Sequence, residues 1–97
     1  MIPADQCRTM EDVRGSVDKI DEQVVVLLGS RFRLMEAAAR IKRNREDVRD
    51  EERKAAVIAH VRRRAEEVGA PPELVAQLYD LLVEGSIAYE FEKFDAR

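Results

Sequence analysis

The sequence has little of what builds sheets, disulfide scaffolds or membrane spans. It contains four glycines and three prolines, too few for an all-β sandwich or barrel, which needs a turn about every 8 to 12 residues. Cys7 is the only cysteine, so no disulfide can form within the chain. No apolar run approaches the roughly 20 residues of a membrane span, and the first residues do not resemble a signal peptide. We therefore expect a cytoplasmic protein with no membrane partner.

Motifs for nucleotide and metal binding are also missing. The sequence has no GxGxxG, Walker or metalloprotease pattern, so we expect no cofactor and no metal. Its 17 lysines and arginines are outnumbered by 20 aspartates and glutamates, which gives a net charge of −3. General polyanion binders rely on a surplus of cations, so the composition argues against a nucleic-acid partner.

What the chain does have is charge and helical periodicity. Of its 97 residues, 45% are apolar, 38% are charged and 5% are aromatic, which is typical of solvated helices in a single domain spanning residues 1–97. Thr9 and Asp12 have the form of a capping box. The stripe that follows has steps of three and four residues and predicts a helix from about residue 10 to about residue 43. Its members are Met10, Val13, Val17, Ile20, Val24, Leu27, Arg31, Leu34, Ala38 and Ile41.

Two further helices are predicted after this one. Asp47 or Asp50 can cap a helix that runs to Val68, and Gly69 is placed just past its end. Pro71 and Pro72 fit the first turn of a third helix, where a missing N–H is harmless. The apolar residues that we expect on the buried side of the third helix are Leu74, Val75, Leu78, Leu81, Leu82, Ile87 and Tyr89.

The predicted first helix is too long for one small chain to cover. At 1.5 Å per residue it would measure about 50 Å, whereas a compact domain of this size has a radius of gyration of about 13 Å. Pairing the helix with its copy in a second chain buries the uncovered length. The predicted fold is therefore all-α, with three helices per chain and an intertwined homodimer.

Arg31 occupies a position in the apolar stripe, where a cation is costly unless an anion meets it. It either pairs with a carboxylate or extends to solvent at the margin of the stripe, or it belongs to an anion site. Lys42 favours the anion site, because eleven helical residues leave it about 20° from Arg31 around the axis. Arg14 lies about 25 Å from Arg31 along the helix and is turned away by about 100°. An antiparallel partner helix would bring its Arg14 back to the other two cations.

Ser86 and Glu90 continue the i, i+4 row that begins with Leu78 and Leu82 in the third predicted helix. They are either polar groups at a frayed helix end or inward-facing members of a site. An inward-facing Glu90 needs an ion-pair partner or must take up a proton.

The chain resembles the small all-helical chorismate mutases and the related isochorismate pyruvate lyases along essentially its whole length. The order and spacing of several short stretches carry this resemblance. They are Val13-Arg14, Ile20-Asp21, Leu27-Leu28 to Arg31, Ala39-Arg40-Ile41-Lys42, Val48-Arg49-Asp50, Glu52-Arg53 and Glu84-Gly85-Ser86-Ile87.

The resemblance implies a homodimer with two sites, each completed by Arg14 of the partner subunit. By position, Arg14 and Arg31 would each bind a substrate carboxylate. Lys42 would contact a carboxylate and the ether oxygen of the breaking C–O bond. The implied reaction, chorismate to prephenate, is pericyclic, so it requires no nucleophile, base or cofactor.

Further positions follow from the same resemblance. Asp50, Arg53 and Ser86 fall where the family places contacts to the ring hydroxyl and carboxylates, or the groups that support them. Two residues depart from the pattern. Lys54 stands where many bacterial mutases have a glutamate that helps to bind the ring hydroxyl, and Glu90 stands where many relatives have a glutamine. Only a protonated Glu90 could donate to the ether oxygen, so we expect a rate that falls as pH rises.

Several functions stay open at this point. The stretches around Arg45–Arg53 and Glu84–Ser86 favour a mutase, whereas the segment Pro3–Arg14 is more like the lyases. A helical dimerisation module without catalysis would use Arg31 and Lys42 for salt bridges between subunits. A nucleic-acid-binding dimer would use Arg62–Arg64, although a solvated helix face balanced by nearby glutamates explains that run as well.

Overall fold

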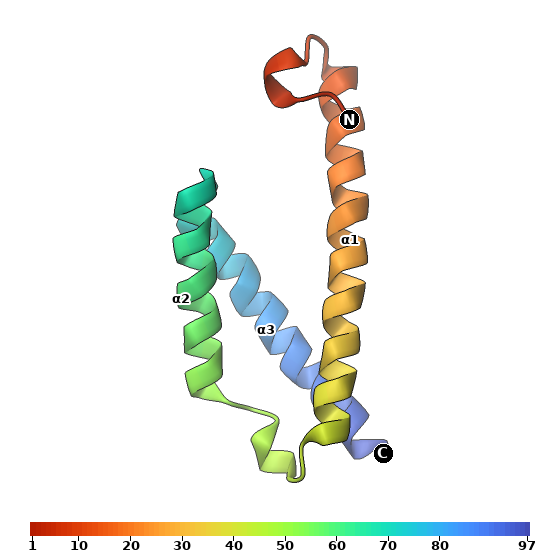
Figure 1. Cartoon of the computed structure of the whole chain (residues 1–97), viewed down its shortest axis with the longest axis vertical. Coiled ribbons are helices and arrows are strands. Elements are labelled where there is room, and N and C mark those ends of the chain that lie inside the picture. Colours follow the sequence, from red (N-terminus) through yellow and green to blue (C-terminus); the bar gives the residue numbers. More distant parts are fainter. The chain divides into compact units, whose positions relative to one another are not determined.

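The computed structural model describes residues 1–97 and is entirely helical, as predicted. It contains α1 (Met10–Ile41), α2 (Glu51–Val68) and α3 (Pro72–Asp95), with two single 3₁₀ turns, η1 (Ala4–Gln6) and η2 (Arg45–Asp47) (Figure 1). There are no strands. None of these helices combines the length and the apolar content that crossing a membrane requires. The chain forms two units, residues 1–33 and 34–97, whose boundary falls within α1.

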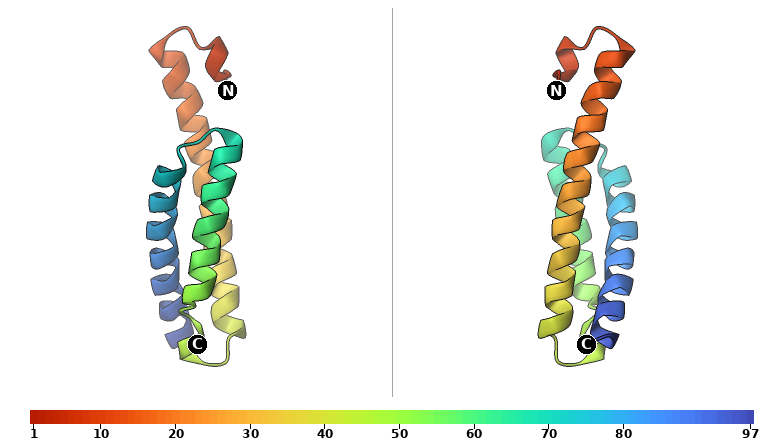
Figure 2. Two further views of the ribbon diagram at one scale, coloured as in Figure 1. Left: turned by 90° about the vertical axis from the view of Figure 1, so that its left-hand side faces the viewer. Right: turned by 90° about the vertical axis from the view of Figure 1, so that its right-hand side faces the viewer.

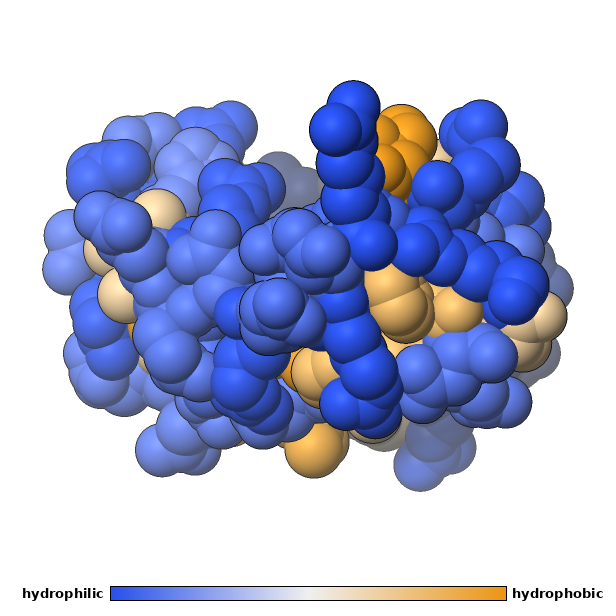
Figure 3. All heavy atoms as spheres, turned by 90° about the horizontal axis from the view of Figure 1, so that it is seen from below, coloured by the Kyte–Doolittle hydropathy of each residue, from blue (hydrophilic) through white to orange (hydrophobic).

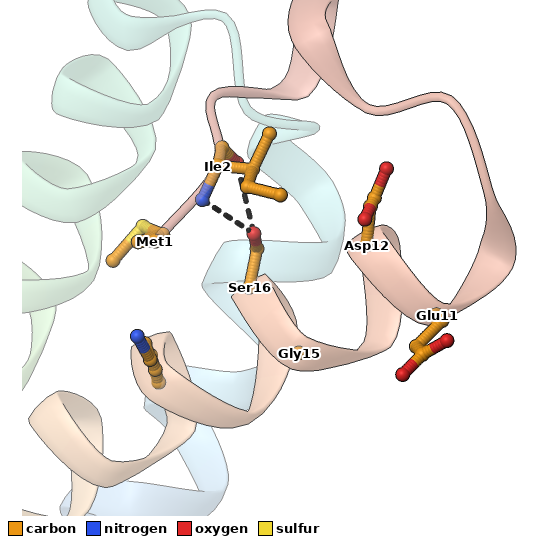
Figure 4. A pocket seen from close by; sticks show the side chains of 7 residues that line it. Met1, Ile2, Glu11, Asp12, Gly15 and Ser16 are labelled. Atoms are coloured by element: carbon orange, nitrogen blue, oxygen red, sulfur yellow. Dashed lines mark hydrogen bonds between the residues drawn. The ribbon is translucent and has the colours of Figure 1, made fainter.

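In residues 1–33, the segment before α1 folds back on the helix. The Ile2 N–H donates to Ser16 Oγ at 3.0 Å, and the Ser16 hydroxyl donates to the Ile2 carbonyl at 2.8 Å (Figure 4). The predicted capping box at the start of α1 is confirmed: Asp12 N–H donates to Thr9 Oγ1 at 3.1 Å, and Thr9 N–H donates to Asp12 Oδ2 at 3.3 Å. These bonds satisfy N–H groups that have no partner within the helix.

The apolar stripe of α1 is largely exposed in the single chain. Val17, Ile20 and Val24 are about half exposed, and Leu27 and Leu34 more so. The expectation that one chain cannot cover this helix stays a prediction.

In residues 34–97, α2 and α3 run antiparallel and pack against each other (Figure 2). Gly69 ends α2 with φ +78°, a left-handed conformation that favours glycine. Ala70 N–H then donates to the Ala65 carbonyl at 2.9 Å, and Gly69 N–H donates to that of Glu66 at 3.3 Å. Pro72 is the first residue of α3. The predicted connection between these two helices is thus confirmed.

The core of this unit is made of small side chains. The buried apolar residues from its segments are Ala39, Val48, Ala65, Ala76 and Val83. Small residues allow helices to approach closely, but they bury little apolar surface. Viewed from the end where α1 stops and α2 begins, the surface is mostly hydrophilic, with apolar residues visible between the charged side chains (Figure 3).

Two details of the single chain differ from the prediction. The first helix ends at Ile41 rather than residue 43, although Lys42 N–H still donates to the Ala38 carbonyl at 2.9 Å. In α3, the expected buried residues Leu74, Leu78 and Leu81 are 52–73% exposed. The buried residues of α3 lie instead on the row Ala76, Val83, Ser86 and Glu90, because α3 is apolar on more than one side and α2 covers only one of them.

Candidate active site

Lys42 is the first residue after α1, and its side chain contacts α3 and the segment that leads to α2. Its ammonium donates to Glu90 Oε2 on α3 at 2.8 Å. It also donates to the Val48 carbonyl at 3.4 Å. The side chain of Lys42 is 30% exposed. One cation of the predicted anion site is therefore directed inward and held from two sides.

Glu90 and Ser86 lie one turn apart on α3 and are both buried, with 4% and 3% exposure. Of the two possibilities left open by the sequence, a frayed helix end or inward-facing groups, the structure shows inward-facing groups. The Ser86 hydroxyl donates to the Leu82 carbonyl at 2.7 Å. A carboxylate this deeply buried is costly without a partner, and Lys42 supplies one. The sequence left open whether an inward-facing Glu90 has an ion-pair partner or takes up a proton; the structure shows the ion pair with Lys42.

Glu84 is the centre of a charge network between the start of α2 and α3. Arg49 contacts its Oε1 at 2.7 Å, and Lys54 contacts its Oε2 at 2.9 Å. Lys54 also pairs with Asp80 at 3.0 Å. Hydrogen bonds from Arg49, and then from Lys54, lower the pKa of Glu84 from 4.5 to about 2. The same carboxylate raises the pKa of Arg49 and of Lys54.

Sequence reasoning did not find this network. It identified Lys54 only as a departure from the family pattern, whereas Lys54 links α2 to two carboxylates of α3. Lys54 and Glu84 are 30 positions apart in the chain. No short sequence pattern therefore indicates that they contact each other.

Asp50 and Arg53 lie at the start of α2, where Asp50 is the N-cap. Asp50 Oδ1 accepts a hydrogen bond from Arg53 N–H at 2.9 Å. This confirms that Asp50, rather than Asp47, caps the helix. Both side chains are exposed. Their contact with a substrate stays a prediction.

The basic run on α2 is engaged in ion pairs. Arg62 Nε lies 3.0 Å from Glu73 Oε1 on α3, and Arg64 Nη1 lies 2.9 Å from Glu67 Oε2. This arrangement favours the solvated helix face over a nucleic-acid site.

The sequence profile described as chorismate mutase type II matches residues 13–91. The chain belongs to the chorismate mutase type II family. The resemblance proposed from the sequence is thereby confirmed. The isochorismate pyruvate lyase of Pseudomonas aeruginosa is 31% identical over 88 residues, which cover 91% of this chain and 87% of that protein.

All the predicted site residues of this chorismate mutase family member lie within the matched range. The structure brings Lys42 and Glu90 together, and it places Ser86 one turn from Glu90. Arg14 and Arg31 are on α1 within residues 1–33, where Arg14 is exposed and Arg31 is half-buried. Their approach to Lys42 stays a prediction.

Proposed function

We propose that this protein is a chorismate mutase that converts chorismate to prephenate. The observation that carries the proposal is the inward-facing pair of Lys42 and buried Glu90, at 2.8 Å, in a chain of the chorismate mutase type II family. It supports the proposal because the pair places a cation beside a buried group that becomes a hydrogen-bond donor when it is protonated.

The reaction asks the protein to bind and orient rather than to form a covalent intermediate. A flexible dicarboxylate must be held in its compact reactive conformer, and donors must face the ether oxygen on which negative charge grows. In the proposed complex, Lys42 contacts a carboxylate and the ether oxygen. Arg31 binds a carboxylate, and Arg14 of the partner subunit binds another. Asp50, Arg53 and Ser86 provide or support the remaining polar contacts.

Glu90 must change its state for this reaction. An ionised Glu90 would repel the developing charge on the ether oxygen, and it holds the ammonium of Lys42. A protonated Glu90 releases Lys42 to the substrate and donates its own O–H to the ether oxygen. The active complex therefore binds one more proton than a complex with ionised Glu90, so the rate falls as pH rises. Glu90→Gln supplies a permanent donor and should flatten this profile; a variant that keeps the wild-type pH dependence would refute this role.

The proposed assembly is an intertwined homodimer. Its support is the exposed apolar surface of the single chain. On α1 this surface comprises Met10, Val13, Val17, Ile20, Val24, Leu27, Leu34 and Ile41, and on α3 it comprises Leu74, Leu78 and Leu81. A second copy would cover these residues and supply Arg14 to the site.

A second candidate is the isochorismate pyruvate lyase reaction, which makes salicylate and pyruvate. The 31% identity to the Pseudomonas aeruginosa lyase favours it. Both reactions act on a cyclic dicarboxylate and need the same cations, so the two proposals share one site.

Separate incubations with chorismate and with isochorismate distinguish them. Prephenate from chorismate as the faster reaction supports the mutase. Salicylate and pyruvate from isochorismate as the faster reaction supports the lyase and overturns the mutase as the main activity. If neither substrate is turned over, both proposals fail and a non-catalytic dimerisation module replaces them.

A further inference from the structure

Arg97 lies two residues beyond α3 and donates hydrogen bonds to the end of α1. Its Nη1 donates to the carbonyl oxygens of Ala39, at 2.9 Å, and of Lys42. Its Nη2 donates to the Arg43 carbonyl at 3.2 Å. The guanidinium also lies 3.7 Å from the centre of the Phe94 ring. One side chain therefore engages three carbonyl acceptors in and just after the last turn of α1, together with an aromatic ring of α3.

These acceptors need a donor from outside the helix. The last carbonyl groups of a helix have no partner within it and carry the negative end of its dipole. Ala39 is only 2% exposed, so water has little access to its carbonyl. A planar guanidinium can serve several carbonyls at once and complements the dipole. Sequence reasoning missed this contact, because 58 positions separate Arg97 from Ala39.

We propose that Arg97 is a positioning residue for Lys42 in the reaction proposed above, on which this inference rests. The ammonium of Lys42 is already held by Glu90 and by the Val48 carbonyl. Arg97 fixes the other end of the same residue, its backbone carbonyl. With its backbone held by Arg97, Lys42 keeps its position when its ammonium passes from Glu90 to the substrate. Arg97 itself touches no substrate.

The test compares Arg97→Ala, Arg97→Lys and a matched control, Arg64→Ala, with the wild-type protein. Arg64 is likewise exposed and forms an ion pair, but its partner Glu67 is on the same helix, α2. Two readouts are needed. Amide hydrogen exchange at Lys42, whose N–H bonds to the Ala38 carbonyl, reports the order of this turn without any substrate. The kcat and KM for chorismate and isochorismate report the consequence for turnover.

We expect Arg97→Ala to raise the exchange rate at Lys42 and to lower kcat by about tenfold to a hundredfold, since a small misplacement of a binding group can cost this much. KM should change much less. Arg97→Lys should recover part of the loss, and Arg64→Ala should match the wild type in both readouts.

Three results would overturn the positioning role: unchanged exchange in Arg97→Ala, raised exchange with unchanged kcat, or equal losses in Arg97→Ala and Arg64→Ala. A wild-type protein inactive on both substrates would overturn the proposed function, and with it the catalytic part of this inference. The exchange data would still decide separately whether Arg97 orders the turn.

Discussion

The pair formed by Lys42 and Glu90 predicts an asymmetric response when each partner is removed. Lys42→Met leaves the Glu90 carboxylate unpaired, and that side chain is only 5% exposed. Glu90→Gln leaves an ammonium whose side chain is 30% exposed. This ammonium can reach water, and it keeps the Val48 carbonyl as an acceptor.

The magnitudes follow from this difference in burial. An unpaired buried charge costs about 3 to 5 kcal/mol, so we expect Lys42→Met to lower the free energy of unfolding by about 3 kcal/mol at neutral pH. Glu90→Gln replaces a charged acceptor by a neutral one next to a hydrated ammonium and should cost about 1 kcal/mol. The double variant Lys42→Met/Glu90→Gln has no unpaired charge. It should be more stable than Lys42→Met alone.

Urea unfolding of the wild type, both single variants and the double variant, at one protein concentration and neutral pH, measures these free energies. Equal costs for the two single variants, or a double variant no more stable than Lys42→Met, would refute the buried-charge reasoning.

Other predictions concern the surrounding residues. The pKa of Glu84 is lowered from 4.5 to about 2 by Arg49 and Lys54. The ionised Glu84 therefore stabilises the fold fully above pH 4.5, and this stabilisation is lost as the pH falls toward 2. In urea unfolding, the difference in free energy of unfolding between wild type and Glu84→Gln should shrink over that range. Asp50→Ala removes the N-cap of α2 and should cost about 1 kcal/mol in the same assay, whereas Asp50→Asn, which keeps the acceptor, should cost much less. Arg31→Ala should lower turnover by about a hundredfold and leave the dimer intact in analytical ultracentrifugation; a weakened dimer with unchanged turnover would contradict the assignment of Arg31 to the site.

The ends of the helices were predictable because their signals are local. The capping box at Thr9, the N-cap Asp50, the left-handed Gly69 and Pro72 at the start of α3 each act within a few residues of the chain. Capping groups bond to the nearest backbone, so the same short pattern gives the same geometry in most contexts.

The inward orientation of Glu90 was also predictable, from its place in a helical row and from the family resemblance. The buried side of α3 was not, since apolar residues such as Leu78 and Val83 lie on different sides of this helix. Periodicity identifies a face only when the other faces are polar.

Contacts between distant parts of the chain account for what the sequence did not reveal. Arg49 and Lys54 reach Glu84, and Arg97 reaches the end of α1. Each contact depends on how α2 and α3 pack rather than on spacing along one helix. Charged residues are frequent in this sequence, at 38%, so choosing partners among them requires the fold.

The most direct test of the account is the turnover of chorismate by wild type and by Lys42→Met, under conditions in which circular dichroism shows both to be folded. We expect the wild type to form prephenate and the variant to be slower by a factor of about a hundred or more, because it lacks the cation that we propose to contact the ether oxygen. A wild type that forms no prephenate, or a folded Lys42→Met variant as fast as the wild type, would contradict it.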